Sequence, residues 1–227
     1  MGIAYRFIKR VLDVVLSSIA TLILLIPWVI IGFIIKIQSP GPAIYKAKRV
    51  GKDGRIFTLY KFRSMRVDSG PIHATTLRGD PRIFPFGNFL RLSKLDETPQ
   101  LLNILRGEMS IIGPRPEDEI NASKLYLGRY KNILEAIPGL SSPASLYDYA
   151  IGEQYDDEIK YEEEFLPKKL EVELYYVKNR NLAYDCALVF RTIVTISAVL
   201  LKRKVPIPWE VEKSLKNKET YSDEVYR

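Results

Sequence analysis

The sequence predicts an α/β protein that is mostly helical, with an apolar N-terminal segment, a small β-hairpin and amphipathic helices. Residues 11–37 are almost continuously apolar, which predicts a membrane helix. Residues 43–50 and 55–62 have the composition of strands, and a glycine-containing turn joins them. Most of the remaining chain follows the helical period. At 227 residues, the chain has the size of one domain plus a membrane element.

Composition limits the classes of partner. Lys and Arg total 34 against 27 Asp and Glu, so the net charge is +7. This excess favours anionic partners such as phospholipid head groups, nucleotides or nucleic acid. Nucleic acid is the weakest of these and we expect none, because the basic residues are spread along the chain. A single cysteine, Cys186, excludes an internal disulfide, and a single histidine excludes a His–Cys metal cluster.

The apolar segment 11–37 admits two membrane topologies. A straight helix of this length would be roughly 40 Å long, enough to cross a ~30 Å hydrocarbon core as a single-pass anchor. However, Pro27 removes a helix hydrogen bond near the middle, and positive residues flank both ends. A re-entrant helix-break-helix, which enters one leaflet and returns, would leave both ends in the cytoplasm. The residues alone leave the two topologies open.

A second apolar helix is predicted over about 182–203. A helical wheel places its polar residues in one sector of about 120°, interrupted by Leu188 and Val199: Asp185, Arg191, Thr192, Thr195 and Lys202. The other positions are mostly Val, Ile, Leu and Phe, which suits an amphipathic helix lying in the membrane interface. An ordinary core-facing helix is the alternative.

Turn residues and periodicity divide the rest of the chain. The run 39–42 ends the membrane segment, and Gly107 is expected to stop a helix that Pro99 starts. We expect a polar loop over 66–82, an irregular segment over 141–157, and helices over 86–92, 99–106, 117–136 and 157–179.

Two adjacent carboxylates, Asp96 and Glu97, are the residues of greatest chemical interest. Pro99 favours a helix beginning here, and a helix N-terminus attracts phosphate. Carboxylates at the same place compete with phosphate unless a cation such as Mg²⁺ bridges them. A carboxylate also attacks phosphorus directly, which gives an aspartyl phosphate. The alternative is that Asp96 or Thr98 only caps the helix.

Several basic residues accompany the acidic pair. Arg91 precedes it by five residues, and Arg115 follows it between two prolines; Lys61 and Arg63 stand at the end of the second strand. The planar fork of arginine suits phosphate. The spacing alone does not establish that these residues converge.

The order of these motifs resembles the bacterial sugar transferases, also called monotopic phosphoglycosyl transferases. The resemblance covers about residues 5–203 and is most specific over 95–116. Its pieces are Lys9-Arg10-x-x-Asp13, Ser39-Pro40-Gly41-Pro42, Arg49-Val50-Gly51, Tyr60-Lys61-Phe62-Arg63-Ser64-Met65, Asp80-Pro81-Arg82-Ile83, Leu95-Asp96-Glu97-x-Pro99-Gln100-Leu101 and Met109-Ser110-Ile111-Ile112-Gly113-Pro114-Arg115-Pro116.

The resemblance implies a reaction and a place for it. Such enzymes transfer a sugar 1-phosphate from a UDP-sugar to polyprenol (undecaprenyl) phosphate and release UMP, at the cytoplasmic face of the bacterial inner membrane. Asp96 matches the nucleophile and Glu97 completes the dyad, beside which Mg²⁺ is held. Lys61, Arg91, Arg115 and Asp185 match polar positions of the family. The resemblance also implies that the N-terminal helix is re-entrant.

These expectations divide the chain into a membrane helix (1–38), a catalytic domain (39–204) and a polar tail (205–227). We expect the catalytic core alone, without a large membrane domain. Ile26 precedes Pro27 where some members of the resembled family have Ser. The run after Pro138-Gly139 resembles another branch of that family, so the identity of the transferred sugar stays open. A homodimer also stays open. A membrane-anchored scaffold of a polysaccharide assembly complex, with Asp96 and Glu97 only capping a helix, is the non-catalytic alternative.

Overall fold

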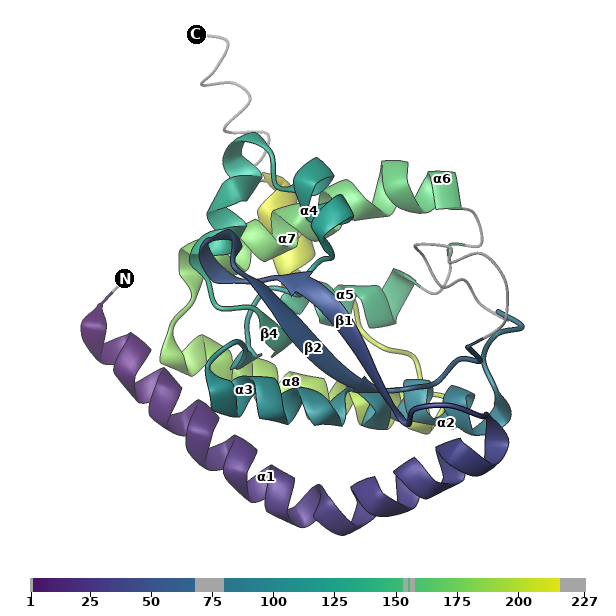
Figure 1. Cartoon of the computed structure of the whole chain (residues 1–227). Coiled ribbons are helices and arrows are strands. Elements are labelled where there is room, and N and C mark those ends of the chain that lie inside the picture. Colours follow the sequence, from purple (N-terminus) through teal and green to yellow (C-terminus); the bar gives the residue numbers. More distant parts are fainter. Residues whose placement is uncertain (1, 68–79, 153–154, 156–157, 217–227) are drawn as a thin grey trace, which may run out of the picture.

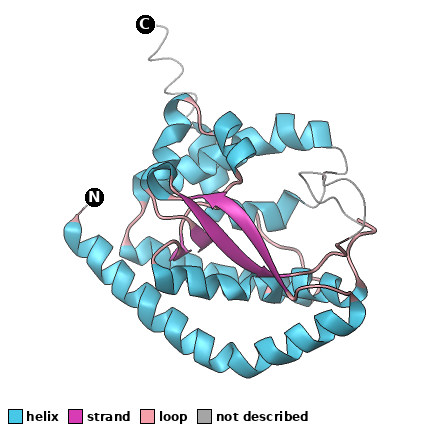
Figure 2. Ribbon diagram, in the orientation of Figure 1, coloured by secondary structure: helices cyan, strands magenta, loops and turns pink. Residues whose placement is uncertain are grey.

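The computed structural model describes residues 2–67, 80–152, 155 and 158–216, and this part of the chain is mostly helical (Figure 1, Figure 2). Part of the expected polar loop 66–82 lies outside the described residues. Two small two-stranded sheets accompany the helices (Figure 2). The predicted class, mostly helical with a β-hairpin and an apolar N-terminal helix, is confirmed.

The apolar segment forms one long helix, α1 (Ile3–Gln38), which passes through Pro27 without interruption. The expected break at Pro27 is therefore absent, although Figure 1 shows α1 strongly bent into two arms. A proline removes only one helical hydrogen bond, so the bend is accommodated while the turns on either side continue. Large apolar residues along both arms are exposed, among them Phe7, Leu22 and Phe33.

Polar side chains fasten both arms of α1 to the same body. From the first arm, Arg10 donates to the carbonyl oxygens of Ile104 (2.5 Å) and Leu105 (2.8 Å). Asp13 on this arm is buried and accepts a hydrogen bond from the backbone N–H of Ile111. From the second arm, Trp28 Nε1 donates to the hydroxyl of Thr98 at 2.9 Å.

The predicted hairpin is present as β1 (Ile44–Val50) and β2 (Ile56–Phe62), antiparallel with Ile44 opposite Phe62. A short 3₁₀ turn, η1 (Lys52–Gly54), joins the strands, and Asp53 and Gly54 both have positive φ there. Both expected strands begin one residue too early. Phe62 packs into a core with Ile31 and Ile35 of α1, so the hairpin rests on the second arm.

The segment that carries the acidic pair follows helix α2 (Pro85–Ser93), which was expected over 86–92. A 3₁₀ helix, η2 (Leu95–Gln100), leads directly into α3 (Leu101–Arg106). Helical structure thus begins at Leu95 and not at Pro99. Gly107 ends α3 with φ +81°, as expected for a left-handed C-terminal position.

Next, β3 (Ser110–Ile112) pairs in parallel with β4 (Gly139–Ser141). Gly113 and Gly139 allow this approach, because a Cβ on Gly139 would lie 2.0 Å from the backbone nitrogen of Gly113. Between the two strands, the single helix expected over 117–136 is instead α4 (Glu119–Leu125) and a 3₁₀ segment, η3 (Gly128–Glu135). Gly128 separates them with φ +52°.

The prediction of an irregular segment over 141–157 is wrong in its first half, where α5 (Pro143–Ile151) forms. Ser142 caps this helix by accepting the backbone N–H of Ser145, and proline occupies the first turn. The helix expected over 157–179 is present in three parts: α6 (Glu158–Lys160), a π-helical turn, η5 (Tyr161–Phe165), and α7 (Leu166–Asn179).

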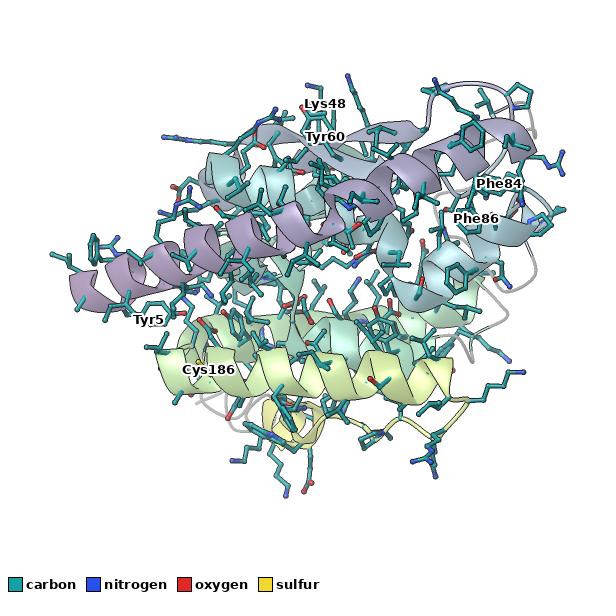
Figure 3. All side chains as sticks on the ribbon, turned by 90° about the horizontal axis from the view of Figure 1, so that it is seen from below. Tyr5, Lys48, Tyr60, Phe84, Phe86 and Cys186 are labelled. Carbon is teal, nitrogen blue, oxygen red and sulfur yellow. The ribbon has the colours of Figure 1, made fainter. Side chains whose placement is uncertain are left out.

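The last long helix, α8 (Leu182–Leu200), turns its polar sector inward. Asp185, Leu188 and Thr195 are buried, whereas Phe190 and Ile193 are more than half exposed. An ordinary core-facing helix buries its apolar face, so this arrangement is the reverse of that alternative. Figure 3, seen from below, shows α8 and α1 on the same face of the molecule. Both are long and apolar enough to cross a membrane.

Part of the expected polar tail is folded. Residues 209–216 are helical, and residues 217–227 lie outside the described residues. Glu210 is fully buried, where it pairs with Arg191 and accepts a hydrogen bond from Tyr184 at 2.9 Å. Trp209 lies against the rings of Tyr175 and Tyr184. A buried carboxylate requires a partner, and Glu210 finds its partners on α8. Together with the ring contacts of Trp209, these bonds fasten the short helix to α7 and α8.

Candidate functional site

Asp96 and Glu97 are buried in the first turn of η2, with 1% and 6% of their surfaces exposed. The Thr98 hydroxyl donates to the carbonyl oxygen of Leu95 at 2.7 Å and accepts from Trp28. These bonds fix the turn against the bend of α1. The residue before this turn, Lys94, forms no side-chain cap bond, and among the described residues Asp96, the alternative helix cap, accepts no hydrogen bond from a backbone N–H.

Two cations meet the carboxylates from different parts of the chain. The ammonium of Lys61, on β2, lies 2.7 Å from Asp96 Oδ2 and 3.8 Å from Glu97 Oε1. From the loop after β3, Arg115 donates from Nη2 to Glu97 Oε1 at 3.0 Å. Four residues predicted from the sequence are therefore together. The link between β2 and η2 is the fold feature that sequence spacing did not reveal.

The two carboxylates have different surroundings. Burial alone would raise the pKa of Glu97, but Arg115, Lys61 and Lys94 hold that pKa well below its ordinary value. Glu97 is therefore an ionised partner of the cations. The Oδ2 of Asp96 is paired with the Lys61 ammonium, whereas the buried Oδ1 has no hydrogen-bond or ion-pair partner among the described residues. Buried carboxylate oxygens are normally satisfied, so this Oδ1 is the oxygen available to a ligand.

The acidic pair fits a magnesium ion in its donor set. Mg²⁺ prefers oxygen ligands and commonly takes one or two carboxylates together with phosphate oxygens and water. Asp96 and Glu97 supply two carboxylates, and the Oδ1 of Asp96, which has no partner among the described residues, suits a cation. Within the described ranges, no cluster of three or more His, Cys, Asp or Glu side chains could hold a metal by itself. Such an ion would thus need oxygens from substrate or water.

Sequence reasoning missed Lys94 and Tyr149. Lys94 lies between α2 and η2 with φ +56°, and its ammonium is 4.5 Å from the centre of the Tyr149 ring, which belongs to α5. Burial lowers the pKa of Lys94, and the charges of Glu97 and Asp96 oppose that shift. The position lies next to the acidic pair in sequence, but its left-handed backbone and its partner on α5 depend on the tertiary structure.

Glu173, on α7, was missed as well. Its Oε1 accepts hydrogen bonds from the backbone N–H of Arg115 and from the hydroxyl of Ser142, each at 3.0 Å. Burial raises the pKa of Glu173 to about 7. This carboxyl therefore positions the backbone of Arg115 and couples it to the start of α5, which carries Tyr149.

Of the other three expected site residues, Arg63 and Asp185 are engaged by contacts elsewhere. Arg63 donates to the carbonyl oxygens of Ser39 and Pro40, so it caps the C-terminal end of α1. Asp185 is engaged by other side chains and is described below. Arg91 lies on α2, and its charge contributes to lowering the pKa of Asp80, after Arg82. In the described part of the chain, none of the three has an ion pair with the acidic pair.

Asp185 is the centre of a buried clamp. Its Oδ2 accepts from the Tyr5 hydroxyl and the Lys9 ammonium, both at 2.7 Å, and its Oδ1 accepts from the Tyr176 hydroxyl at 2.8 Å. The three partners come from α1 and α7. Figure 3 shows Tyr5 at the end of α1 near the start of α8. Asp185 therefore joins three helices, and the structure gives it no contact with Asp96 or Glu97.

Fold and site together define the class of this protein, which is one that transfers phosphate groups beside an apolar surface. An apolar face built from α1 and α8 adjoins a body in which a buried carboxylate pair meets Lys61 and Arg115. Buried carboxylates, fixed cations and a suitable metal donor set are the components of a phosphate-transfer site.

The comparisons identify the family within this class. A model of the bacterial sugar transferase family matches residues 4–199. The chain therefore belongs to the bacterial sugar transferase family, and the resemblance inferred from its motifs is confirmed.

Similar proteins include a UDP-N-acetylgalactosamine-undecaprenyl-phosphate N-acetylgalactosaminephosphotransferase of Aeromonas hydrophila, 36% identical over 197 residues. That match covers 85% of this chain and 44% of the relative. A UDP-glucose:undecaprenyl-phosphate glucose-1-phosphate transferase of Caulobacter vibrioides is 33% identical, with 83% and 69% covered. Exopolysaccharide production protein PSS of Rhizobium leguminosarum is 34% identical, with 83% and 94% covered. The chain thus spans less than half of the first relative and almost all of the last.

Proposed function

We propose that this protein is a polyprenol-phosphate phosphoglycosyl transferase that initiates the assembly of a membrane glycan. It moves a sugar 1-phosphate from a UDP-sugar to undecaprenyl phosphate. The carrying observation is the buried Asp96: Lys61 lies 2.7 Å from its Oδ2, and its Oδ1 has no hydrogen-bond partner among the described residues. A helix cap would use such an oxygen; a nucleophile needs it free. Membership of the family and the names of its relatives support the same reaction class.

The proposed reaction has two displacements. An oxygen of Asp96 attacks the phosphorus that bears the sugar, the bond from this phosphorus to the bridging oxygen breaks, and UMP leaves with that oxygen. An oxygen of undecaprenyl phosphate then attacks the same phosphorus, and the bond to Asp96 breaks. The products are the lipid diphosphate sugar and free Asp96. A covalent intermediate lets one small site receive the two phosphates in turn.

The surrounding residues have distinct roles in this proposal. Lys61 orients Asp96 and offsets phosphate charge, and Arg115 holds Glu97 and presents its remaining donors to a phosphate oxygen. Asp96 and Glu97 would hold Mg²⁺ together with substrate oxygens. When bound, the ion supplies positive charge against the phosphate oxygens. Glu173 keeps the backbone of Arg115 in place.

We further propose that α1 is re-entrant and that the protein is monotopic at the cytoplasmic face of the inner membrane. Both arms of α1 bond to one body, through Arg10 and Asp13 on the first arm and Trp28 on the second. A single-pass helix would carry one arm away from that body. Exposed apolar residues around the bend and along α8 need lipid, because a large exposed apolar surface is unfavourable in water.

Cysteine labelling tests this topology. In a Cys186→Ser background, Ile3→Cys and Lys46→Cys place one thiol at each exposed end of the segment. An impermeant maleimide should label neither thiol in intact spheroplasts and both after permeabilisation. Ile26→Cys, at the exposed bend, is the control and should stay protected by lipid. Labelling of one end only in intact spheroplasts would establish a single-pass anchor.

Release of UMP tests the reaction. The protein in nanodiscs is given undecaprenyl phosphate, Mg²⁺ and one member of a panel of UDP-sugars at a time. Release with a particular sugar, dependent on the lipid phosphate for continued turnover, would establish the reaction class and name the donor. Absence of release from every donor, in a preparation with normal helical content, would favour the membrane-anchored scaffold over the enzyme.

A further inference from the structure

Lys94 occupies a backbone conformation that a lysine rarely adopts. Its φ of +56° and ψ of +16° are left-handed, at the junction where α2 ends and η2 begins. Glycine or asparagine is the usual residue in such a position, because a Cβ is disfavoured there. The lysine thus carries a conformational cost that glycine would avoid.

The ammonium of Lys94 is held beside the acidic pair without forming an ion pair with either carboxylate. It lies 4.5 Å from the centre of the Tyr149 ring, within the range of a cation–π contact. Lys61 contacts Asp96 at 2.7 Å, and Arg115 contacts Glu97 at 3.0 Å. For Lys94, no ion pair or side-chain hydrogen bond is present among the residues described. Its three N–H donors are therefore available to a ligand.

We propose that Lys94 binds the phosphate group that leaves in the first displacement and then the lipid phosphate that takes its place. This inference rests on the proposed function. An in-line displacement places the leaving oxygen opposite Asp96 across the attacked phosphorus. When the second displacement expels Asp96, the attacking lipid phosphate must arrive on that same opposite side. One cation there serves both phosphates. Lys61 and Arg115 are paired with the carboxylates, whereas Lys94 has no ion pair among the described residues.

Both displacements need positive charge on the side of the attacked phosphorus that lies opposite Asp96. As the bond to the bridging oxygen breaks, negative charge grows on the departing UMP, and a fixed cation beside it stabilises that charge. The incoming lipid carries a phosphate monoester, which needs the same charge before it attacks. The ring of Tyr149 keeps the ammonium in place without neutralising it, whereas a carboxylate partner would remove its net charge.

Lys94→Gly separates this role from folding. It removes the ammonium and also the conformational cost of a side chain at a positive φ. The melting temperature of the variant should therefore be no lower than that of the wild type. We expect the inhibition constant of UMP and the KM of undecaprenyl phosphate to rise together, each by roughly tenfold or more, the value of one charge-assisted hydrogen bond. Lys94→Arg restores the charge and should recover most of both losses. Tyr149→Leu should shift both constants in the same direction by less.

Lys46→Gln is the matched control, because it removes one exposed lysine charge from β1 and should change neither constant. A rise in the KM of the UDP-sugar with unchanged constants for UMP and the lipid would place Lys94 on the transferred phosphate and overturn the proposal. Unchanged constants throughout would also overturn it. If the wild type releases no UMP from any donor, the proposed function itself fails. This outcome differs from failure of the Lys94 proposal, in which the wild type is active and the variants have unchanged constants in the same assay.

Discussion

Asp96→Asn is expected to abolish turnover, with a loss of at least about 10³-fold in kcat, because an amide is a poor nucleophile toward phosphorus. The substitution keeps the size and shape of a side chain that is 1% exposed. It also removes a buried charge that is paired with Lys61 at 2.7 Å. Lys61 keeps a second carboxylate, Glu97, at 3.8 Å. We therefore expect the variant to fold and to bind membranes like the wild type.

Intact-mass measurement separates this nucleophile from a merely polar residue. With a UDP-sugar and Mg²⁺ but no lipid acceptor, the wild type should gain the mass of a phosphosugar, and Asp96→Asn should gain none. Asp53→Asn is the matched control, since Asp53 lies exposed in the hairpin turn, where asparagine also tolerates the positive φ. Full turnover in Asp96→Asn, or a phosphosugar on another residue of the wild type, would contradict the assignment.

The sequence predicts those parts of the fold whose signals are local. The hairpin was located within one residue because strand composition and a glycine-containing turn coincide between Ile44 and Phe62. The stop at Gly107 was correct because a left-handed C-terminal position favours glycine. Helix α5 also has a local signal, a Ser142 cap followed by proline in the first turn.

What the sequence could not supply is long-range pairing. The parallel pair of β3 with β4 joins residues about 30 positions apart, and no spacing rule relates them. The same limit applies to the site. Lys61 and Arg115 were candidates by residue type, and only the tertiary structure places them on the acidic pair, Lys61 through the packing of β2 beside η2 and Arg115 from the loop after β3. Arg63 and Asp185 were equally good candidates by type, yet tertiary contacts engage them at the ends of α1 and α8.

Charged residues near the ends of apolar segments thus have two different uses in this chain. Arg10 and Asp13 in the first arm of α1 bond to backbone groups of the body, and Asp185 bonds to side chains of α1 and α7. These polar contacts turn the charged sides of α1 and α8 inward and leave the apolar sides outward. In a membrane interface this orientation is favourable for both kinds of residue, because the charged residues avoid lipid and the apolar residues contact it.

Replacement of Asp185 should therefore affect stability far more than chemistry. Asp185→Asn removes the charge that pairs with Lys9 in a site where the two side chains are 7% and 15% exposed. Breaking a buried pair by removing one partner leaves the other charge uncompensated, which costs about 3 kcal/mol or more. An asparagine also presents an N–H₂ group to one of three partners that all donate. We expect a markedly lower melting temperature in detergent, measured by circular dichroism.

Kinetics and a double-mutant cycle distinguish this clamp from the substrate-binding role that the sequence suggested for Asp185. Below its melting temperature, Asp185→Asn should keep the wild-type KM for the UDP-sugar, because no contact joins it to Asp96 or Glu97. Lys9→Met removes the opposite charge, so Lys9→Met with Asp185→Asn should cost less than the sum of the two single changes. A wild-type melting temperature with a raised KM for the donor would instead return Asp185 to the binding site. A clamp is the stronger reading because both oxygens of Asp185 already accept hydrogen bonds from Tyr5, Lys9 and Tyr176, which join α8 to α1 and α7.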